Sequence, residues 1–149
     1  MSRARLTPKL IGALYTEAMV LADEARSYFD RQGRDERDAL DPILRVGFSC
    51  ESLKVTTRLM HIIAWLLTQR AVANGELHEG DALDPSRRLG DAPPTDEKEI
   101  AILPDSARLL VGASIDLHRR VAHFDRAQVR PAHCDSPARQ MMDRLALAF

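Results

Sequence analysis

The chain has 149 residues, with 21 basic and 22 acidic side chains and a formal net charge of −1. This length is typical of one domain, so we expect a single domain spanning residues 1–149. Hydrophobic residues make up 45% of the sequence but aromatic residues only 5%, a balance that favours packed helices over a β-sandwich. The small net charge argues against a nucleic-acid binder, which needs a concentrated cationic face.

The sequence also indicates a cellular compartment. It contains no apolar run of about 18 residues that could span a membrane, and its first residues lead into no apolar signal segment. We therefore expect a cytoplasmic protein that does not associate with membranes. Its two cysteines, Cys50 and Cys134, are expected to be free thiols, because a reducing cytoplasm disfavours disulfides.

The first predicted helix covers residues 8–31. Thr7 can cap its first amide groups, and Pro8 lies where no amide hydrogen is needed. Residues 30–41 alternate in charge sign and are expected to form a solvated connection. Apolar side chains recur every three or four residues along one stripe of this helix, at Ile11, Leu14, Ala18, Leu21, Ala25 and Tyr28.

The second predicted helix covers residues 49–74, from Ser49 to Asn74, where a glycine follows that can cap the helix end. Its apolar face is wide, because a stripe through Leu53, Met60 and Leu67 has a second stripe beside it. A wide face predicts contact with two neighbouring helices, or with one helix and a second subunit. The candidate dimer or inter-helix contacts are Leu59, Ile62, Trp65 and Leu66.

Residues 75–100 are rich in glycine, proline and acidic side chains. They predict a long acidic loop that is either functional or partly disordered. A third helix is predicted over 105–125, and Ser136 and Pro137 predict the start of a short C-terminal helix over 137–148. The expected fold is all-α, an elongated antiparallel three-helix bundle with a short C-terminal helical segment. The stripe of the third helix consists of Ala107, Leu110, Ser114, Leu117, Val121 and Phe124.

The residue types of catalytic and metal sites do not gather in the sequence. His118 and His123 lie about 140° apart around a helix and cannot chelate one ion by themselves. His61 is interpreted as a helix-flank histidine with a satisfied hydrogen bond, and no second ligand pair accompanies His133 and Cys134. No glycine-rich phosphate loop or GxSxG motif is present. We expect no catalytic residues, no metal and no cofactor.

Two polar features leave alternatives open. Cys50, next to the start of the predicted helix, is either a mildly activated thiol or a small buried filler. The hydroxyls of Thr56 and Thr57 either bond back to the preceding turn or belong to a polar docking surface. A candidate protein-interaction surface comprises Lys54, Thr57, Arg58, Gln69, Arg70, Arg119 and Arg120.

Several segments resemble a known family. The run Thr56-Thr57-Arg58-Leu59-Met60, with Ala64-Trp65-Leu66-Leu67, Gln69-Arg70-Ala71 and Gly75-Glu76 after it, resembles the signature of the RcdA family. These proteins are the regulators of CtrA degradation in alphaproteobacteria. The resemblance extends to residues 25–29, 104–110 and 114–120 and so covers most of the chain.

The resemblance implies a three-helix bundle without enzymatic activity, forming a homodimer. It also implies an accessory or adaptor factor for the ClpXP protease, which works with a CpdR-like factor to deliver CtrA-like cargo. Family members often continue into a polar C-terminal tail, whereas this chain ends at Phe149, soon after the third helix. Its apolar end is expected to pack on the bundle; the alternative is that the end itself is presented to the protease.

Two further hypotheses stay open at this point. A nucleic-acid-associated helical regulator would use Arg119, Arg120, Arg126 and Arg130, and its affinity would fall steeply with salt. A metal or thiol enzyme would require Cys50, Cys134 or the histidines to converge in space.

Overall fold

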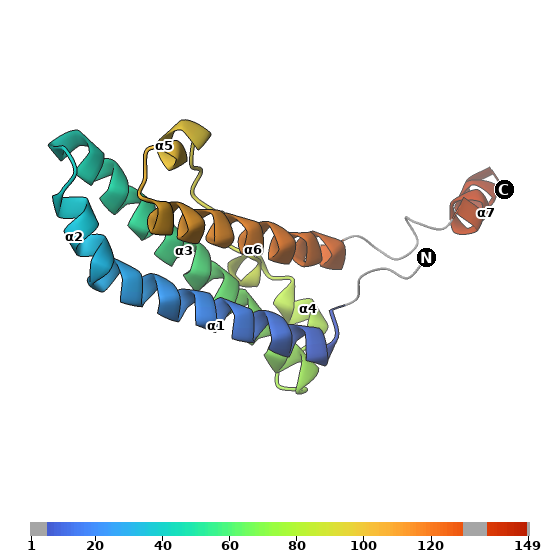
Figure 1. The fold of residues 1–149 in the computed structure, drawn as a ribbon. Coiled ribbons are helices and arrows are strands. Elements are labelled where there is room, and N and C mark those ends of the chain that lie inside the picture. Colours follow the sequence, from blue (N-terminus) through green and yellow to red (C-terminus); the bar gives the residue numbers. More distant parts are fainter. Residues whose placement is uncertain (1–5, 130–136, 149) are drawn as a thin grey trace.

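The structure of the chain, a computed structural model, describes residues 6–129 and 137–148. Helices joined by turns and irregular segments make up the described part, which contains no β-strand. Three long helices, α1 (Pro8–Asp30), α3 (Pro42–Ala73) and α6 (Asp105–Val129), pack along one another in an elongated bundle (Figure 1). The predicted all-α bundle is confirmed.

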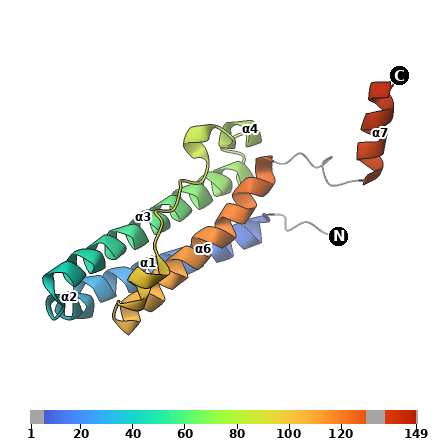
Figure 2. The same ribbon diagram turned by 90° about the horizontal axis from the view of Figure 1, so that it is seen from above.

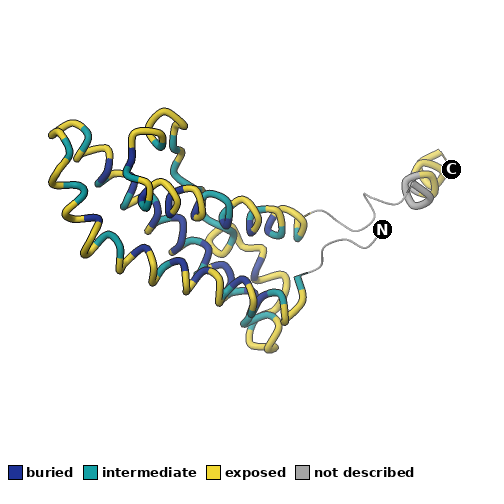
Figure 3. The backbone as a smooth tube through the Cα atoms, in the orientation of Figure 1, coloured by how far each residue is buried: buried dark blue, intermediate teal, exposed yellow. Residues whose placement is uncertain are grey.

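Helix α1 follows from local signals in the sequence. The Thr7 hydroxyl accepts a hydrogen bond from the Leu10 amide at 3.1 Å, and Pro8 occupies the first turn. Burial follows the inner side of each long helix, as the dark segments of the tube in Figure 3 show. The buried residues of α1 are Ile11, Leu14, Ala18, Leu21 and Ala25, and of the predicted stripe only Tyr28 is half-buried.

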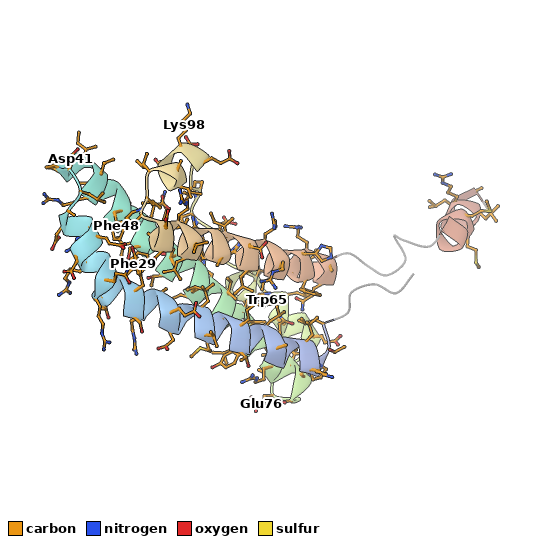
Figure 4. All side chains as sticks on the ribbon, viewed as in Figure 1. Phe29, Asp41, Phe48, Trp65, Glu76 and Lys98 are labelled. Atoms are coloured by element: carbon orange, nitrogen blue, oxygen red, sulfur yellow. The ribbon has the colours of Figure 1, made fainter. Side chains whose placement is uncertain are left out.

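Helix α3 begins at Pro42, about two turns before the predicted start, with Asp41 at the N-cap position. The preceding segment is also not a simple solvated connection, because it contains α2 (Gln32–Asp38). A tertiary contact explains the earlier start of α3. Phe48 is buried with its ring 5.7 Å from that of Phe29 (Figure 4), which anchors the first turns of α3 to α1. Edge-to-face aromatic pairs of this kind stabilise a core beyond the area that they bury.

Helices α3 and α6 run parallel, which corrects the predicted antiparallel order. Arg58 contacts Ser114, and Trp65, further along α3, contacts Asp125, further along α6. The connection between the two helices, residues 74–104, therefore returns along the whole bundle before α6 begins (Figure 2). Only α1 runs opposite to both of the other long helices (Figure 1).

The connection starts where Gly75, with a φ of 76°, ends α3 in the left-handed conformation that favours glycine. It then forms α4 (Glu79–Ala82), a 3-10 turn (Pro85–Arg87) and α5 (Glu97–Ala101). We call residues 88–95 the strap, because they cross from α4 to α5 along α3 and α6 (Figure 2). The acidic loop of the sequence is thus an ordered part of the fold.

Helix α7 (Pro137–Ala148) forms the predicted C-terminal helical segment. Its large apolar side chains Met141, Met142, Leu145 and Leu147 are exposed, so the expectation that this segment packs on the bundle is wrong. None of the helices in the described ranges combines the length and apolarity needed to cross a bilayer.

Candidate interaction surface

Arg58 is the most deeply buried charged residue of α3, with no exposed surface. One guanidinium nitrogen, Nη1, donates to Ser114 Oγ of α6 at 3.2 Å. The other, Nη2, donates to the Pro93 carbonyl at 2.9 Å and to Thr95 Oγ1 at 2.6 Å. The side chain therefore ties α3 to α6 and to the strap, and the prediction that Arg58 lies on an interaction surface is wrong.

Glu51, about two turns before Arg58 on α3, supplies the opposite charge. It is buried, and its carboxylate accepts hydrogen bonds from Thr95 Oγ1 at 2.8 Å and from Lys54 Nζ at 3.0 Å. Burial lowers the pKa of the Arg58 guanidinium, and the charge of Glu51 opposes that effect. Buried charges are tolerated in this way when they are paired and hydrogen-bonded.

Asp125 of α6 is the second buried anchor of the strap. Its carboxylate accepts hydrogen bonds from Trp65 Nε1 at 3.0 Å and from Arg88 Nε and Nη2, both at 2.7 Å. The Leu89 amide donates at 3.4 Å. Burial by itself would raise the pKa of Asp125, but the hydrogen bonds and the charge of Arg88, with the bonds from Leu89 and Trp65, lower it below its ordinary value.

Two histidines hold the middle of the strap through its backbone. His61 Nδ1 lies 3.0 Å from the Asp91 carbonyl and His118 Nε2 lies 2.8 Å from the Gly90 carbonyl. Each ring must donate, since a carbonyl oxygen only accepts. A Cβ atom at Gly90 would lie 2.5 Å from His61 Nδ1, so any side chain here would force the His61 ring to move. The interpretation of His61 as a satisfied helix-flank histidine is confirmed.

Sequence analysis missed this strap as a structural unit. Its anchors, Glu51, Arg58, His61, His118 and Asp125, come from two helices that are far apart in sequence. The available signals were charged residues on the α3 stripe and the Pro93–Pro94 pair, which holds the backbone extended. Neither signal identifies a partner by itself.

The other predicted interaction residues of α3 are partly engaged inside the chain. Lys54 pairs with Glu51 and lies 3.8 Å from a carboxylate oxygen of Glu99 in α5. The Thr57 hydroxyl donates to the Leu53 carbonyl at 3.0 Å, and Thr56 bonds back in the same way to the preceding turn. These bonds confirm the interpretation that the hydroxyls satisfy the helix itself.

Gln69 and Arg70 lie at the end of α3 that adjoins the start of α1. Gln69 is buried and accepts a hydrogen bond from the side chain of Gln128, so its assignment to an exposed surface is wrong. The Arg70 guanidinium lies 4.3 Å from the centroid of the Tyr15 ring of α1, a cation–π contact. Arg70 is half-buried.

Arg119 and Arg120 lie on α6, away from the polar residues of α3. Arg119 pairs with Asp116, and Arg120 pairs with both Asp116 and Glu17 of α1. The seven predicted residues therefore fall on several seams of the bundle and form no single patch. The paired acidic groups also weaken the hypothesis of a cationic face for nucleic acid; of its other residues, Arg130 lies outside the described residues.

Of the two apolar stripes of α3, the one predicted to contain the candidate dimer contacts is buried and the other is exposed. Leu59, Ile62, Trp65 and Leu66 are buried in the core of one chain, so they are inter-helix contacts and are not available to a second subunit. The stripe through Leu53, Met60 and Leu67 is exposed instead, at 68%, 64% and 46%.

Thiol and metal chemistry find little support in the described residues. Cys50 is exposed and lies two turns inside α3, so it is neither a buried filler nor next to the amide groups of a helix start. Residues 6–129 and 137–148 contain no group of three histidine, cysteine or acidic side chains that could hold a metal ion. His133 and Cys134 lie outside the described residues.

Comparison with known proteins identifies the family. Residues 2–149 match a family described as "Protein of unknown function (DUF1465)". No curated protein matches the chain. The crystal structure of RcdA from Caulobacter crescentus CB15 is similar, with a TM-score of 0.65 and 34% sequence identity over 84% of this chain and 93% of RcdA. The chain therefore belongs to the family of RcdA, as the motif in its second predicted helix indicates.

Proposed function

We propose that this chain is a non-enzymatic adaptor in regulated proteolysis, acting in the cytoplasm as a homodimer. It helps to deliver a CtrA-like cell-cycle regulator to the ClpXP protease, together with a CpdR-like factor. The observation that carries the proposal is the similarity to RcdA over 84% of the chain. A shared fold alone would not be sufficient, and the similarity to RcdA also includes 34% sequence identity.

The proposed mechanism is tethering. An adaptor that holds cargo close to the protease raises the local concentration of the cargo and makes or breaks no bond itself. The bundle suits this role, because its buried polar groups serve to fix the strap, whereas apolar and charged side chains remain exposed. Of the residues predicted to contact partners, we retain Lys54, Arg70, Arg119 and Arg120.

A reconstituted degradation assay tests the proposal. Purified ClpXP, a CpdR-like factor and a CtrA-like cargo are mixed with increasing amounts of the chain, and loss of cargo is followed over time. The degradation rate should rise and then fall as excess adaptor binds cargo and protease separately, a signature of tethering. A cargo that ClpXP degrades unaided is the control and should not respond.

A rate that is independent of the chain would contradict the proposal, and a rate that rises to a plateau would contradict tethering. Arg119→Glu then tests one of the retained residues. The Arg119 side chain is 74% exposed and pairs only with its helix neighbour Asp116 among the described residues, so reversal should weaken capture of the partners without unfolding the bundle. Arg26→Glu on α1, whose side chain is 77% exposed, is the matched control.

A further inference from the structure

Helix α3 carries a second apolar row on the side that faces away from the bundle. We call it the outer row. Six of its members are exposed, whereas Thr57 and Ala71 are half-buried. The outer row consists of Val46, Cys50, Leu53, Thr57, Met60, Ala64, Leu67 and Ala71.

The outer row repeats every seven residues, with alternating steps of four and three. This average period of 3.5 lets two helices wind around each other and remain in contact over many turns. The row contains one series of large side chains and one series of small ones. The large series is Val46, Leu53, Met60 and Leu67, and the small series is Cys50, Thr57, Ala64 and Ala71.

We propose that the outer row seats a second copy of this chain, with the two α3 helices antiparallel. The inference rests on the homodimer of the proposed function and specifies its interface. In an antiparallel pair, each layer joins a residue of one series to a residue of the other series on the partner. One register pairs large with small in every layer, and two-fold symmetry then repeats each pair.

In that register Cys50 faces Leu67 of the partner subunit, and Thr57 faces Met60 of the partner subunit. Ala64 faces Leu53 of the partner subunit, and Ala71 faces Val46 of the partner subunit. Layers of matched volume fill the space between two helices without voids or overlap. A parallel pair would instead place large side chains against large and small against small, leaving the small layers underpacked.

The flanks of the outer row also suit a second copy. The two cations beside it are engaged within their own chain, Lys54 with Glu51 and Arg70 over the Tyr15 ring. No like charges are thus forced together at the proposed contact. An isologous interface, in which the same surface serves both subunits, requires this kind of self-compatibility.

Helix α7 is the other occupant that this chain could offer, and it is too short. It has 12 residues, about 18 Å at the helical rise of 1.5 Å per residue, whereas the outer row extends for about 38 Å. At most half of the row could be covered by α7. A second α3 has the same length as the row and covers all of it.

Sedimentation equilibrium of the full chain tests the interface. The wild type should have twice the 16.7 kDa mass of one chain. The mass of the variant Leu53→Glu/Met60→Glu should be two-fold lower, that of the monomer. Leu109→Glu, on α6, is the matched control, because Leu109 is exposed at 73% but lies outside the row, and it should remain a dimer. Circular dichroism establishes that each variant is helical.

A monomeric wild type, or a double variant that is still dimeric, would overturn the inference. Mild oxidation then tests the register in a Cys134→Ser background. Leu67→Cys should cross-link to Cys50 of the partner subunit, because facing positions come within the roughly 7 Å between Cα atoms that a disulfide allows. Met60→Cys, displaced by one heptad, should not cross-link to Cys50.

Cross-linking through Cys50 alone would instead indicate a parallel pair and would overturn the antiparallel register. The two proposals fail separately. If the monomeric variant still accelerates cargo degradation, tethering does not need the dimer. If the Leu67→Cys cross-link forms but the wild type has no effect on degradation, the interface stands and the adaptor function does not.

Discussion

The two faces of α3 differ in a way that their sequence patterns do not reveal. The inner face is buried and contains three strongly polar residues, Glu51, Arg58 and Gln69. The outer face is exposed and contains Leu53 and Met60. Both faces carry apolar side chains at helical spacing. The inner face is nevertheless the one with the strongly polar residues.

The difference shows that a buried polar residue depends on where its partners lie. Arg58 and Glu51 can be inside because the strap brings Thr95 and the Pro93 carbonyl to them. Without such partners the burial of these groups would cost several kcal/mol. Within residues 6–129 and 137–148, the outer face has no such partners, and it is apolar in a pattern suited to another helix.

The largest expected effect comes from breaking the inner face at Arg58. Arg58→Ala removes the buried hydrogen bonds to Ser114, the Pro93 carbonyl and Thr95 and leaves a cavity, so unfolding should become easier by about 3–5 kcal/mol. Urea denaturation measures the loss. Thr56→Ala on the same helix is the control, because Thr56 is exposed, and it should change stability by less than about 0.5 kcal/mol. Equal effects would show that Arg58 is not a structural tie.

Asp125→Asn should have the next largest effect. The asparagine amide has no charge and only one acceptor oxygen for the two hydrogen bonds from Arg88. The free energy of unfolding at pH 7 should therefore fall by about 2 kcal/mol. The pKa of Asp125 is lowered in the folded protein, so its contribution is present above the unfolded pKa and is lost as pH falls through the folded value.

The difference between wild type and Asp125→Asn should therefore shrink on acidification. Urea denaturation at pH 7 and near pH 3 measures it, since unperturbed aspartates titrate at about pH 3.9. Asp23→Asn is the control, because Asp23 is exposed on α1. A difference that is the same at both pH values would contradict an ionised Asp125 in the strap anchor.

Gly90→Ala should act on the strap alone, through a clash with the His61 ring. We expect a loss of about 1–3 kcal/mol and faster hydrogen exchange at the strap amides. Gly12→Ala is the matched control, because nothing lies within 4 Å of the added Cβ. That substitution should stabilise α1 by about 0.5–1 kcal/mol. Unchanged exchange at the strap in Gly90→Ala would contradict the close approach to His61.

The smallest effect is expected at Met60, which lies two positions before Ile62 on α3. Ile62 is completely buried and Met60 is 64% exposed. In a Leu53→Glu background, chosen to weaken the proposed dimer contact while Met60 stays in place, Ile62→Ala should cost about 2–5 kcal/mol. Met60→Ala should change the free energy of unfolding by less than about 0.5 kcal/mol. Urea denaturation compares them. A large cost at Met60 would mean that the outer row packs within its own chain.

Local sequence signals were sufficient where one helix had one apolar side. The stripe of α1 and most of that of α6 are buried as predicted, and the Gly75 stop has the expected left-handed geometry. Such signals act within a few residues, through caps, turn geometry and helical period. The resemblance to the RcdA family also rests on the sequence itself.

Only the tertiary structure decided which side of α3 is inside, the parallel direction of α6 and the path of the strap. Arg58 donates a hydrogen bond to Thr95, and Trp65 donates one to Asp125, although these pairs are 37 and 60 positions apart in sequence. Helical period records that a side is apolar but does not record what will cover it. Burial of a polar residue depends on a partner that folding alone brings near, and for that reason the interaction residues predicted at Arg58 and Gln69 proved to be buried.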